Sequence, residues 1–258
     1  MLTQQDIYVT TIMAAKSIVL ITGGNTGIGL EVVRALAKTS TAYSILVGSR
    51  SVTKGEEAIE TVKGEIPDSS STFSVVQVDV TSDDSLEKAT KTIDEQHGRL
   101  DILINNAGAG FDGQIASGAL GIREAFNKSW DTNVTGTHVL TTLCVPLLLK
   151  SSNPRLLFVT SGTSTLTETE RFDHPIFQRI NASPPAGWPK EAGVNPLTSY
   201  RSTKTGLNML MREWYKILKN DGVKIWAISP GFLATGLGGV GAEQLKKVCN
   251  VLCTSDME

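Results

Sequence analysis

Short apolar runs alternate with amphipathic stretches along most of this chain. Runs typical of buried strands, rich in β-branched residues, occupy residues 18–21, 43–47, 73–78, 100–104, 156–160 and 223–228. Apolar residues recur at helical spacing over 30–38, 53–62, 83–96, a long stretch ending near 149, and 200–218. Strict alternation of strand and helix indicates parallel strands joined by right-handed crossovers. The sequence therefore predicts an α/β fold with a doubly wound parallel sheet in a single domain.

Two segments depart from this pattern. Residues 1–12 show no clear periodicity, and we expect a loose tail before the domain that spans 13–258. Residues 162–196 are polar and proline-rich, which indicates a long insertion in an otherwise regular pattern. Loops of this length are often functional, although a passive surface insertion is the alternative.

The first predicted strand leads into a glycine turn. Thr22 opens the turn, Gly23, Gly27 and Gly29 follow, and the next helix begins directly afterwards. Gly23 allows a tight turn, Gly27 lets a pyrophosphate approach the backbone, and Gly29 lets helix and strand pack closely. The helix start offers free N–H groups and a positive dipole end. This context favours a dinucleotide site over an ordinary glycine loop, and the missing Gly-Lys-Ser/Thr argues against a nucleoside-triphosphate loop.

The composition narrows the class of partner. The 258 residues carry a net charge of −2 with scattered lysine and arginine, so we expect neither nucleic acid nor an anionic membrane as a partner. No run of about 18 apolar residues marks a membrane span. The three cysteines are too few for a disulfide framework and lack zinc spacing, and the three histidines are isolated. We expect a cytoplasmic protein without a bound metal.

Candidate ligand-binding residues follow directly on four predicted strands: Asp79, Asn105, Ser161 and Pro230. Open parallel sheets bind ligands beyond the carboxyl ends of their strands. These residues and the glycine turn are therefore expected to converge on one edge of the sheet.

Two tyrosine–lysine pairs stand four residues apart in the last predicted helix, Tyr200 with Lys204 and Tyr215 with Lys219. The ordinary pKa of tyrosine, about 10, is too high for work near neutrality, and a neighbouring ammonium is expected to lower it towards a useful acid or base. A helix that follows a parallel strand runs antiparallel to it, so its first turn lies near the carboxyl ends of the strands. Tyr215 lies about 22 Å further along the axis. We therefore predict Tyr200 and Lys204 as the catalytic pair and Tyr215 as a packing or surface residue.

Ser161 and Asn133 are two further candidates. Ser161 could donate a hydrogen bond to a substrate carbonyl oxygen, although a strand-end cap is the alternative. The surrounding residues lack the Gly-x-Ser-x-Gly pattern of a serine hydrolase. Asn133 lies in the middle of a predicted helix, where asparagine is unfavourable unless a contact compensates.

Arg50 bears on the choice between NADH and NADPH. The adenine-ribose hydroxyl of NAD is usually held by Asp or Glu about 20 residues past the glycines. Neutral Ser49 stands at this distance from Gly29, and Arg50 follows it. Because the planar guanidinium binds phosphate well, we predict NADPH/NADP+ as the cofactor. A solvent-facing arginine is the alternative.

The ordered set of motifs resembles the short-chain dehydrogenase/reductase family. The matching residues, within 17–235, are Thr22-Gly23-xxx-Gly27-Ile28-Gly29, Asp79-Val80, Asn105-Asn106-Ala107-Gly108, Asn133, Ser161, Tyr200-xxx-Lys204 and Pro230-Gly231 with Thr235. The proline-rich insertion, with Gly187-Trp188-Pro189-Lys190-Glu191, is similar to a fungal branch of NADPH-dependent carbonyl reductases.

The resemblance implies a Rossmann fold and hydride transfer between a nicotinamide and a ketone, aldehyde or alcohol. In this family Lys204 would bond the nicotinamide ribose, and Asn133 would hold a water that links Lys204 to solvent. Asp79 and Val80 would contact the adenine, and Thr235 the carboxamide side. The other implied cofactor contacts are Thr22, Gly23, Asn25, Gly27, Ile28, Gly29, Asn106, Ala107, Gly108, Tyr200, Pro230 and Gly231. A non-catalytic cofactor sensor and a family member with epimerase or dehydratase chemistry remain the alternatives.

The residues after Thr235 predict one short amphipathic helix, because Ala242, Leu245, Val248, Cys249 and Leu252 recur at helical spacing. No seventh strand is expected there. The last strand would then be an open sheet edge unless the tail covers it. We expect a monomer or a homodimer rather than a tetramer, with an open substrate cleft.

Overall fold

The computed structural model describes residues 16–173, 175–190 and 197–231. Three expectations concern residues outside these ranges: the loose tail at 1–12, the helix predicted after Thr235 in place of a seventh strand, and the cofactor contact of Thr235 itself.

Six parallel strands form one sheet in the order β3-β2-β1-β4-β5-β6. The strands are β1 (Ser17–Thr22), β2 (Tyr43–Ser49), β3 (Thr72–Gln77), β4 (Ile102–Asn105), β5 (Arg155–Val159) and β6 (Lys224–Ile228). The chain builds outwards from β1 to β3 and then from β4 to β6 on the other side, so its direction reverses between β1 and β4. The predicted doubly wound sheet of a single domain is confirmed.

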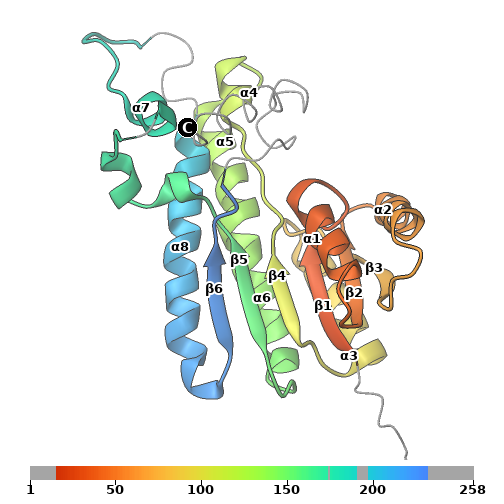
Figure 1. The fold of residues 1–258 in the computed structure, drawn as a ribbon. Helices are drawn as coiled ribbons and strands as arrows, with labels where there is room; N and C mark the ends of the chain where they lie inside the picture. Colours follow the sequence, from red (N-terminus) through yellow and green to blue (C-terminus); the bar gives the residue numbers. More distant parts are fainter. Residues whose placement is uncertain (1–15, 174, 191–196, 232–258) are drawn as a thin grey trace, which may run out of the picture.

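Helices cover both faces of the sheet (Figure 1). They are α1 (Gly27–Ala37), α2 (Val52–Glu65), α3 (Asp83–His97), α4 (Asp112–Ala116), α5 (Ile122–Trp130), α6 (Gly136–Leu148), α7 (Pro175–Asn181) and α8 (Thr198–Leu218). Helices α3, α6 and α8 share one apolar core with the sheet, and α1 and α2 share the other. On β1, Leu20 faces the first core, whereas Val19 and Ile21 face the second. Burial on both faces explains the continuous apolar runs of the sequence.

The long helical stretch predicted to end near 149 is confirmed, since α6 ends at Leu148, but it is not a single regular helix. Helices α4 and α5 come first, a π-helical turn η1 (Asp131–Thr135) follows, and α6 completes the stretch. π-turns inside helices are rare and occur mostly at functional sites. The candidate Asn133 lies within this turn.

Two predicted strand ends also need correction. Asn105 is the last residue of β4 rather than the first after it, and its Nδ2 donates to the Thr141 hydroxyl (3.0 Å) inside the core. Strand β2 continues through Gly48 and Ser49. At Gly48 a Cβ atom would lie 2.8 Å from the backbone oxygen of Ile21, so the glycine lets β1 and β2 approach closely.

The insertion at 162–196 contains regular structure in its described part. Two 3₁₀ turns, η2 (Gly162–Ser164) and η3 (Thr167–Glu170), precede α7. Figure 1 shows this segment beyond the carboxyl ends of the strands, beside the start of α8.

Within the described ranges, no helix has the length and apolar character needed to cross a membrane. In the same part of the chain, no group of three or more His, Cys, Asp or Glu residues is placed to hold a metal ion.

Candidate active site

Thr22 joins the glycine turn to the end of β4. Its hydroxyl oxygen accepts hydrogen bonds from the backbone N–H groups of Asn106 (3.0 Å) and Ala107 (2.9 Å). Asn106 Nδ2 in turn donates to the backbone oxygens of Thr22 (2.8 Å) and Gly23 (3.3 Å). These bonds lie where the strand order reverses, which is the place where open α/β sheets bind ligands.

The glycine turn is packed too tightly for other residues. Gly23 and Gly27 have φ angles of 64° and 54°, in the left-handed region that favours glycine. A Cβ atom on Gly29 would lie 2.2 Å from the backbone oxygen of Gly23. The sequence-based roles of Gly23 and Gly29, a tight turn and close packing of helix on strand, agree with this geometry.

The start of α1 differs from the starts of the next two helices. Ser51 and Ser82 cap α2 and α3 with side-chain hydrogen bonds. Thr26, which precedes α1, makes no such bond, and the first turn of α1 has no acidic residue. The uncapped N–H groups and the positive dipole end therefore fit an anion such as the pyrophosphate of a dinucleotide.

Arg50, Asp79 and Val80 lie at the carboxyl ends of β2 and β3. The exposed Arg50 side chain has no hydrogen bond or ion pair with any residue that the structure describes. Asp79 Oδ1 accepts hydrogen bonds from both the backbone N–H and the hydroxyl of Thr81. Val80 is buried against the start of α6, where a Cβ atom on Gly136 would lie 1.8 Å from the Val80 backbone oxygen.

Asn133 is fully buried, and its amide ties two segments together. Oδ1 accepts from the backbone N–H of Ala109 (2.8 Å), and Nδ2 donates to the backbone oxygen of Ala109 (2.7 Å) and to Thr203 Oγ1 (2.9 Å). These bonds supply the compensation that an asparagine inside a helix needs. Asn133 thereby joins the segment after β4 to α8.

Lys204 is a buried cation on the first core-facing turns of α8. Its side chain is 3% exposed, and Nζ donates to the backbone oxygen of Val159 (2.8 Å) at the end of β5. Burial lowers the pKa of Lys204 from 10.5 to about 8. A Cβ atom on Gly108 would meet both Lys204 Nζ and Asn133 Oδ1, so the three residues are neighbours.

Tyr200 lies one turn before Lys204, which confirms that α8 begins at the carboxyl ends of the strands. Lys204 Nζ is 5.8 Å from the centre of the Tyr200 ring. Burial raises the pKa of Tyr200, and a side-chain hydrogen bond with Ser161 acts in the opposite direction. The expected lowering of this pKa is therefore not found, because desolvation of the phenol outweighs the effects that favour its ionised form. Ser161 Oγ also lies 2.9 Å from Thr163 Oγ1.

Tyr215 occupies a different environment. Its side chain is 45% exposed on the outer face of α8, near Arg212 and Lys219. Of the two tyrosine–lysine pairs, the structure thus places only the first beside Ser161 and Gly108.

Asp112 was not predicted as a site residue, yet it holds the start of α8. Its carboxylate is 8% exposed and accepts hydrogen bonds from the backbone N–H groups of Ser199 (2.8 Å) and Tyr200 (3.0 Å) and from the Ser199 hydroxyl (2.8 Å). A capping carboxylate normally belongs to the same local stretch as the helix, whereas this one comes from far earlier in the chain. No local sequence pattern could have revealed it.

Ser199 and Thr203 are two further residues near the site, and the sequence contained a weak indication of both. They are buried, and they lie four residues apart on α8. Polar residues on the core-facing side of a helix predict buried hydrogen bonds.

Pro230 and Gly231 lie just after β6, and Gly231 has a φ of 78°.

Three comparisons with known proteins agree with one another. A family model for short chain dehydrogenases matches residues 17–171. The short-chain dehydrogenase/reductase tropE of Talaromyces stipitatus is 42% identical over 227 residues, which cover 88% of this chain and 82% of that protein. The short-chain dehydrogenase/reductase eupG of a Phoma species is 46% identical over 226 residues, covering 86% and 79%.

The fold has many solved counterparts. NADPH-bound carbonyl reductase from chicken fatty liver superposes with a TM-score of 0.67 at 22% identity, covering 92% of this chain and 91% of that one. A 7α-hydroxysteroid dehydrogenase solved with NADH superposes with a TM-score of 0.62 at 22% identity, covering 90% and 74%. With the matched family model and the two fungal relatives, these results show that the chain belongs to the short-chain dehydrogenase/reductase family of oxidoreductases.

Proposed function

We propose that this protein is an NADPH-dependent reductase of ketones or aldehydes. The observation that carries the proposal is the meeting of Tyr200, Ser161 and Lys204 at the carboxyl edge of the sheet, the edge that also carries the glycine turn. A cofactor sensor would need the glycine turn but not this trio. NADPH, when bound, supplies the hydride that goes to the carbonyl carbon.

The protein side chains supply the proton, orient the carbonyl group and stabilise the charge that develops. Tyr200 donates its phenolic proton to the carbonyl oxygen, which the raised pKa permits because the phenol stays protonated at neutral pH. Ser161 orients and polarises that oxygen by donating a hydrogen bond. Lys204 places a positive charge near the phenol and stabilises the tyrosinate left after proton transfer. Asn133 supports the water-mediated relay from Lys204.

Cofactor choice rests on the end of β2. The end of β2, which Arg50 follows, lies next to the glycine turn, since Gly48 pairs with Thr22 and accepts a hydrogen bond from the Gly24 N–H (2.9 Å). The exposed Arg50 guanidinium has no partner among the residues that the structure describes. A planar guanidinium suits the 2′-phosphate of NADPH.

The Tyr200→Phe and Tyr215→Phe variants test the proposal. Each loses one hydroxyl from the same helix, but only Tyr200 lies at the site. Tyr200→Phe is expected to lower kcat for NADPH oxidation with aldehydes and ketones by at least ~100-fold, because it removes the acid. NADPH affinity should stay nearly unchanged, measured by quenching of protein fluorescence.

The control, Tyr215→Phe, should keep wild-type turnover. Loss of activity in this variant together with retention in Tyr200→Phe would show that the active pair has been assigned wrongly. Equal activity of all three proteins would exclude a phenolic acid from the reaction.

A further inference from the structure

We propose that Arg201 fixes the insertion against the active-site helix and thereby determines which carbonyl substrates are accepted. The proposal concerns a positioning residue, and its specificity part rests on the proposed reductase function. Arg201 follows Tyr200 directly, at the point where the insertion returns to the sheet.

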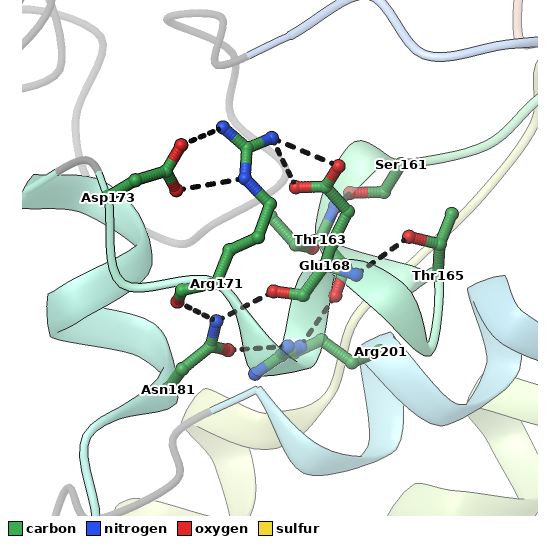
Figure 2. Close-up of polar contacts among 8 residues, drawn as sticks. All are labelled: Ser161, Thr163, Thr165, Glu168, Arg171, Asp173, Asn181 and Arg201. Atoms are coloured by element: carbon green, nitrogen blue, oxygen red, sulfur yellow. Dashed lines mark hydrogen bonds and ion pairs between the residues drawn. The ribbon is translucent and has the colours of Figure 1, made fainter.

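Arg201 uses all three of its side-chain nitrogen atoms on the insertion. Figure 2 shows two of these contacts, with Thr163 and Asn181. Nε donates to the backbone oxygen of Thr163 (2.7 Å) in η2. Nη1 donates to the backbone oxygen of Ile180 (3.0 Å), and Nη2 donates to Asn181 Oδ1 (2.9 Å), both at the end of α7. One side chain therefore holds the beginning of the insertion and its helix in a fixed relation to Tyr200.

The insertion is itself cross-linked around Asn181. Its Nδ2 donates to the backbone oxygens of Glu168 (2.7 Å) and Arg171 (3.0 Å). The Arg171 guanidinium pairs with the carboxylates of Glu168 and Asp173 and lies 4.3 Å from the centre of the Phe177 ring. Because these contacts link η3 to α7, displacement of Asn181 should move η3 and α7 together.

Arg201 is well suited to a positioning role. It is half-buried, and burial lowers its pKa below the ordinary value of arginine. Its recorded partners are neutral oxygens, and it makes no ion pair with a carboxylate of the described residues. Hydrogen bonds from a charged donor are stronger than neutral ones and are directional, so three of them restrict the guanidinium closely.

The position of the insertion matters for the substrate because of its connection to Ser161. The Ser161 hydroxyl accepts a hydrogen bond from the Thr163 N–H (3.2 Å), and Arg201 holds the backbone oxygen of the same Thr163. The insertion also carries exposed Phe172 and Trp188, which could contact an apolar substrate. The glycine turn lies across the sheet, on β1 and α1. Movement of the insertion should therefore alter substrate fit and leave cofactor binding unchanged.

The test uses the full chain and the variants Arg201→Met, Arg201→Lys and Asn181→Ala, with Arg212→Met as a matched control. Met keeps the helix propensity and the apolar stem but removes every donor. Arg212 is exposed on the same helix and makes no hydrogen bond with the described residues, so its substitution reports general effects. The readouts are kcat and KM for a small aldehyde and a bulky aromatic ketone, the Kd of NADPH, and limited proteolysis mapped by mass spectrometry.

For Arg201→Met we expect kcat/KM for the bulky ketone to fall by ~10-fold or more, mainly through KM, with a change of less than ~3-fold for the small aldehyde. Cleavage within 162–190 should become faster, and the Kd of NADPH should not change. Arg201→Lys should restore part of the loss. Asn181→Ala should also lower kcat/KM for the bulky ketone, because it removes the contact with Arg201 and both Nδ2 hydrogen bonds. The double variant Arg201→Met/Asn181→Ala should lose less than the sum of the two single losses, because both substitutions remove the same Arg201–Asn181 contact.

Unchanged cleavage in Arg201→Met would overturn the proposed attachment. Faster cleavage with equal losses for both substrates, or an equal response of Arg212→Met, would overturn the specificity role. A wild-type protein that reduces no carbonyl would refute the proposed function and the specificity role with it, whereas protection from proteolysis would still decide the attachment.

Discussion

Lys204 is a proposed catalytic residue that also affects the stability of the folded protein. Its folded-state pKa of about 8 lies below the ordinary value of 10.5, so folding disfavours the charged form. Between these two pH values the unfolded chain binds more protons than the folded one, and stability contributed by this group therefore rises with pH. Below pH 8 the buried ammonium lowers the free energy of unfolding by an amount that does not change with pH. Retaining such a cation is understandable if Tyr200 needs a positive neighbour.

This linkage predicts a measurable difference between the wild type and Lys204→Met. The free energy of unfolding of the wild type should increase by ~2 kcal/mol relative to the variant between pH 7.5 and 10, because the cost of the ammonium disappears. Urea unfolding of the cofactor-free proteins measures it, and titrations of other groups cancel in the difference. A difference that stays constant with pH would show that the pKa of Lys204 is not lowered.

At the residue scale, the sequence predicted which residues belong to the candidate site better than it predicted their burial and pKa values. The sequence showed that Tyr200 and Lys204 lie four residues apart on a predicted helix. It also showed the polar residue Asn133 in the middle of another predicted helix. The sequence did not show the raised pKa of Tyr200, because burial of a phenol depends on segments that are distant in sequence.

Helix α8 carries Tyr200 and Lys204, and its first turn is held by residues that belong to other elements. Asp112 caps the N–H groups of Ser199 and Tyr200, and Arg201 holds the insertion one residue later. Periodicity predicted this helix over 200–218, and it runs from Thr198 to Leu218. Its cap could not be predicted, since the capping carboxylate belongs to α4.

The cap leads to a prediction for Asp112→Asn. The backbone N–H groups of Ser199 and Tyr200 donate to different carboxylate oxygens, and asparagine has only one oxygen, so one of the two N–H groups loses its acceptor and the first turn of α8 should shift. We expect a loss of ~1–2 kcal/mol in stability and a decrease in kcat of ~10-fold or more, because small displacements of a catalytic group are costly.

Asp101→Asn is the matched control for this substitution. Asp101 is also 8% exposed and accepts from the backbone N–H of Ile18 (2.8 Å) and the Ser151 hydroxyl, but at the amino end of the sheet. It should lose stability while keeping kcat. If Asp101→Asn and Asp112→Asn lost the same fraction of kcat, the effect of Asp112 would be one of general stability.

At the scale of the whole molecule, hydrophobic periodicity was sufficient for the architecture. The alternation of strands and helices predicted the doubly wound parallel sheet, whereas the strand order, with its reversal between β1 and β4, comes from the structure. The internal order of the insertion and the break at η1 escaped prediction, because irregular segments follow side-chain hydrogen bonds rather than a repeating pattern. The expected monomer or homodimer stays a prediction.

Isotope transfer tests the central claim most directly. The wild-type protein is supplied with a panel of aldehydes and ketones and with NADPH or NADH deuterated at the transferable C4 position, and the products are analysed by mass spectrometry. The account predicts alcohols that carry deuterium at the former carbonyl carbon, formed with a higher kcat/KM for NADPH than for NADH. Alcohols without deuterium, no turnover of any carbonyl, or a preference for NADH would contradict it.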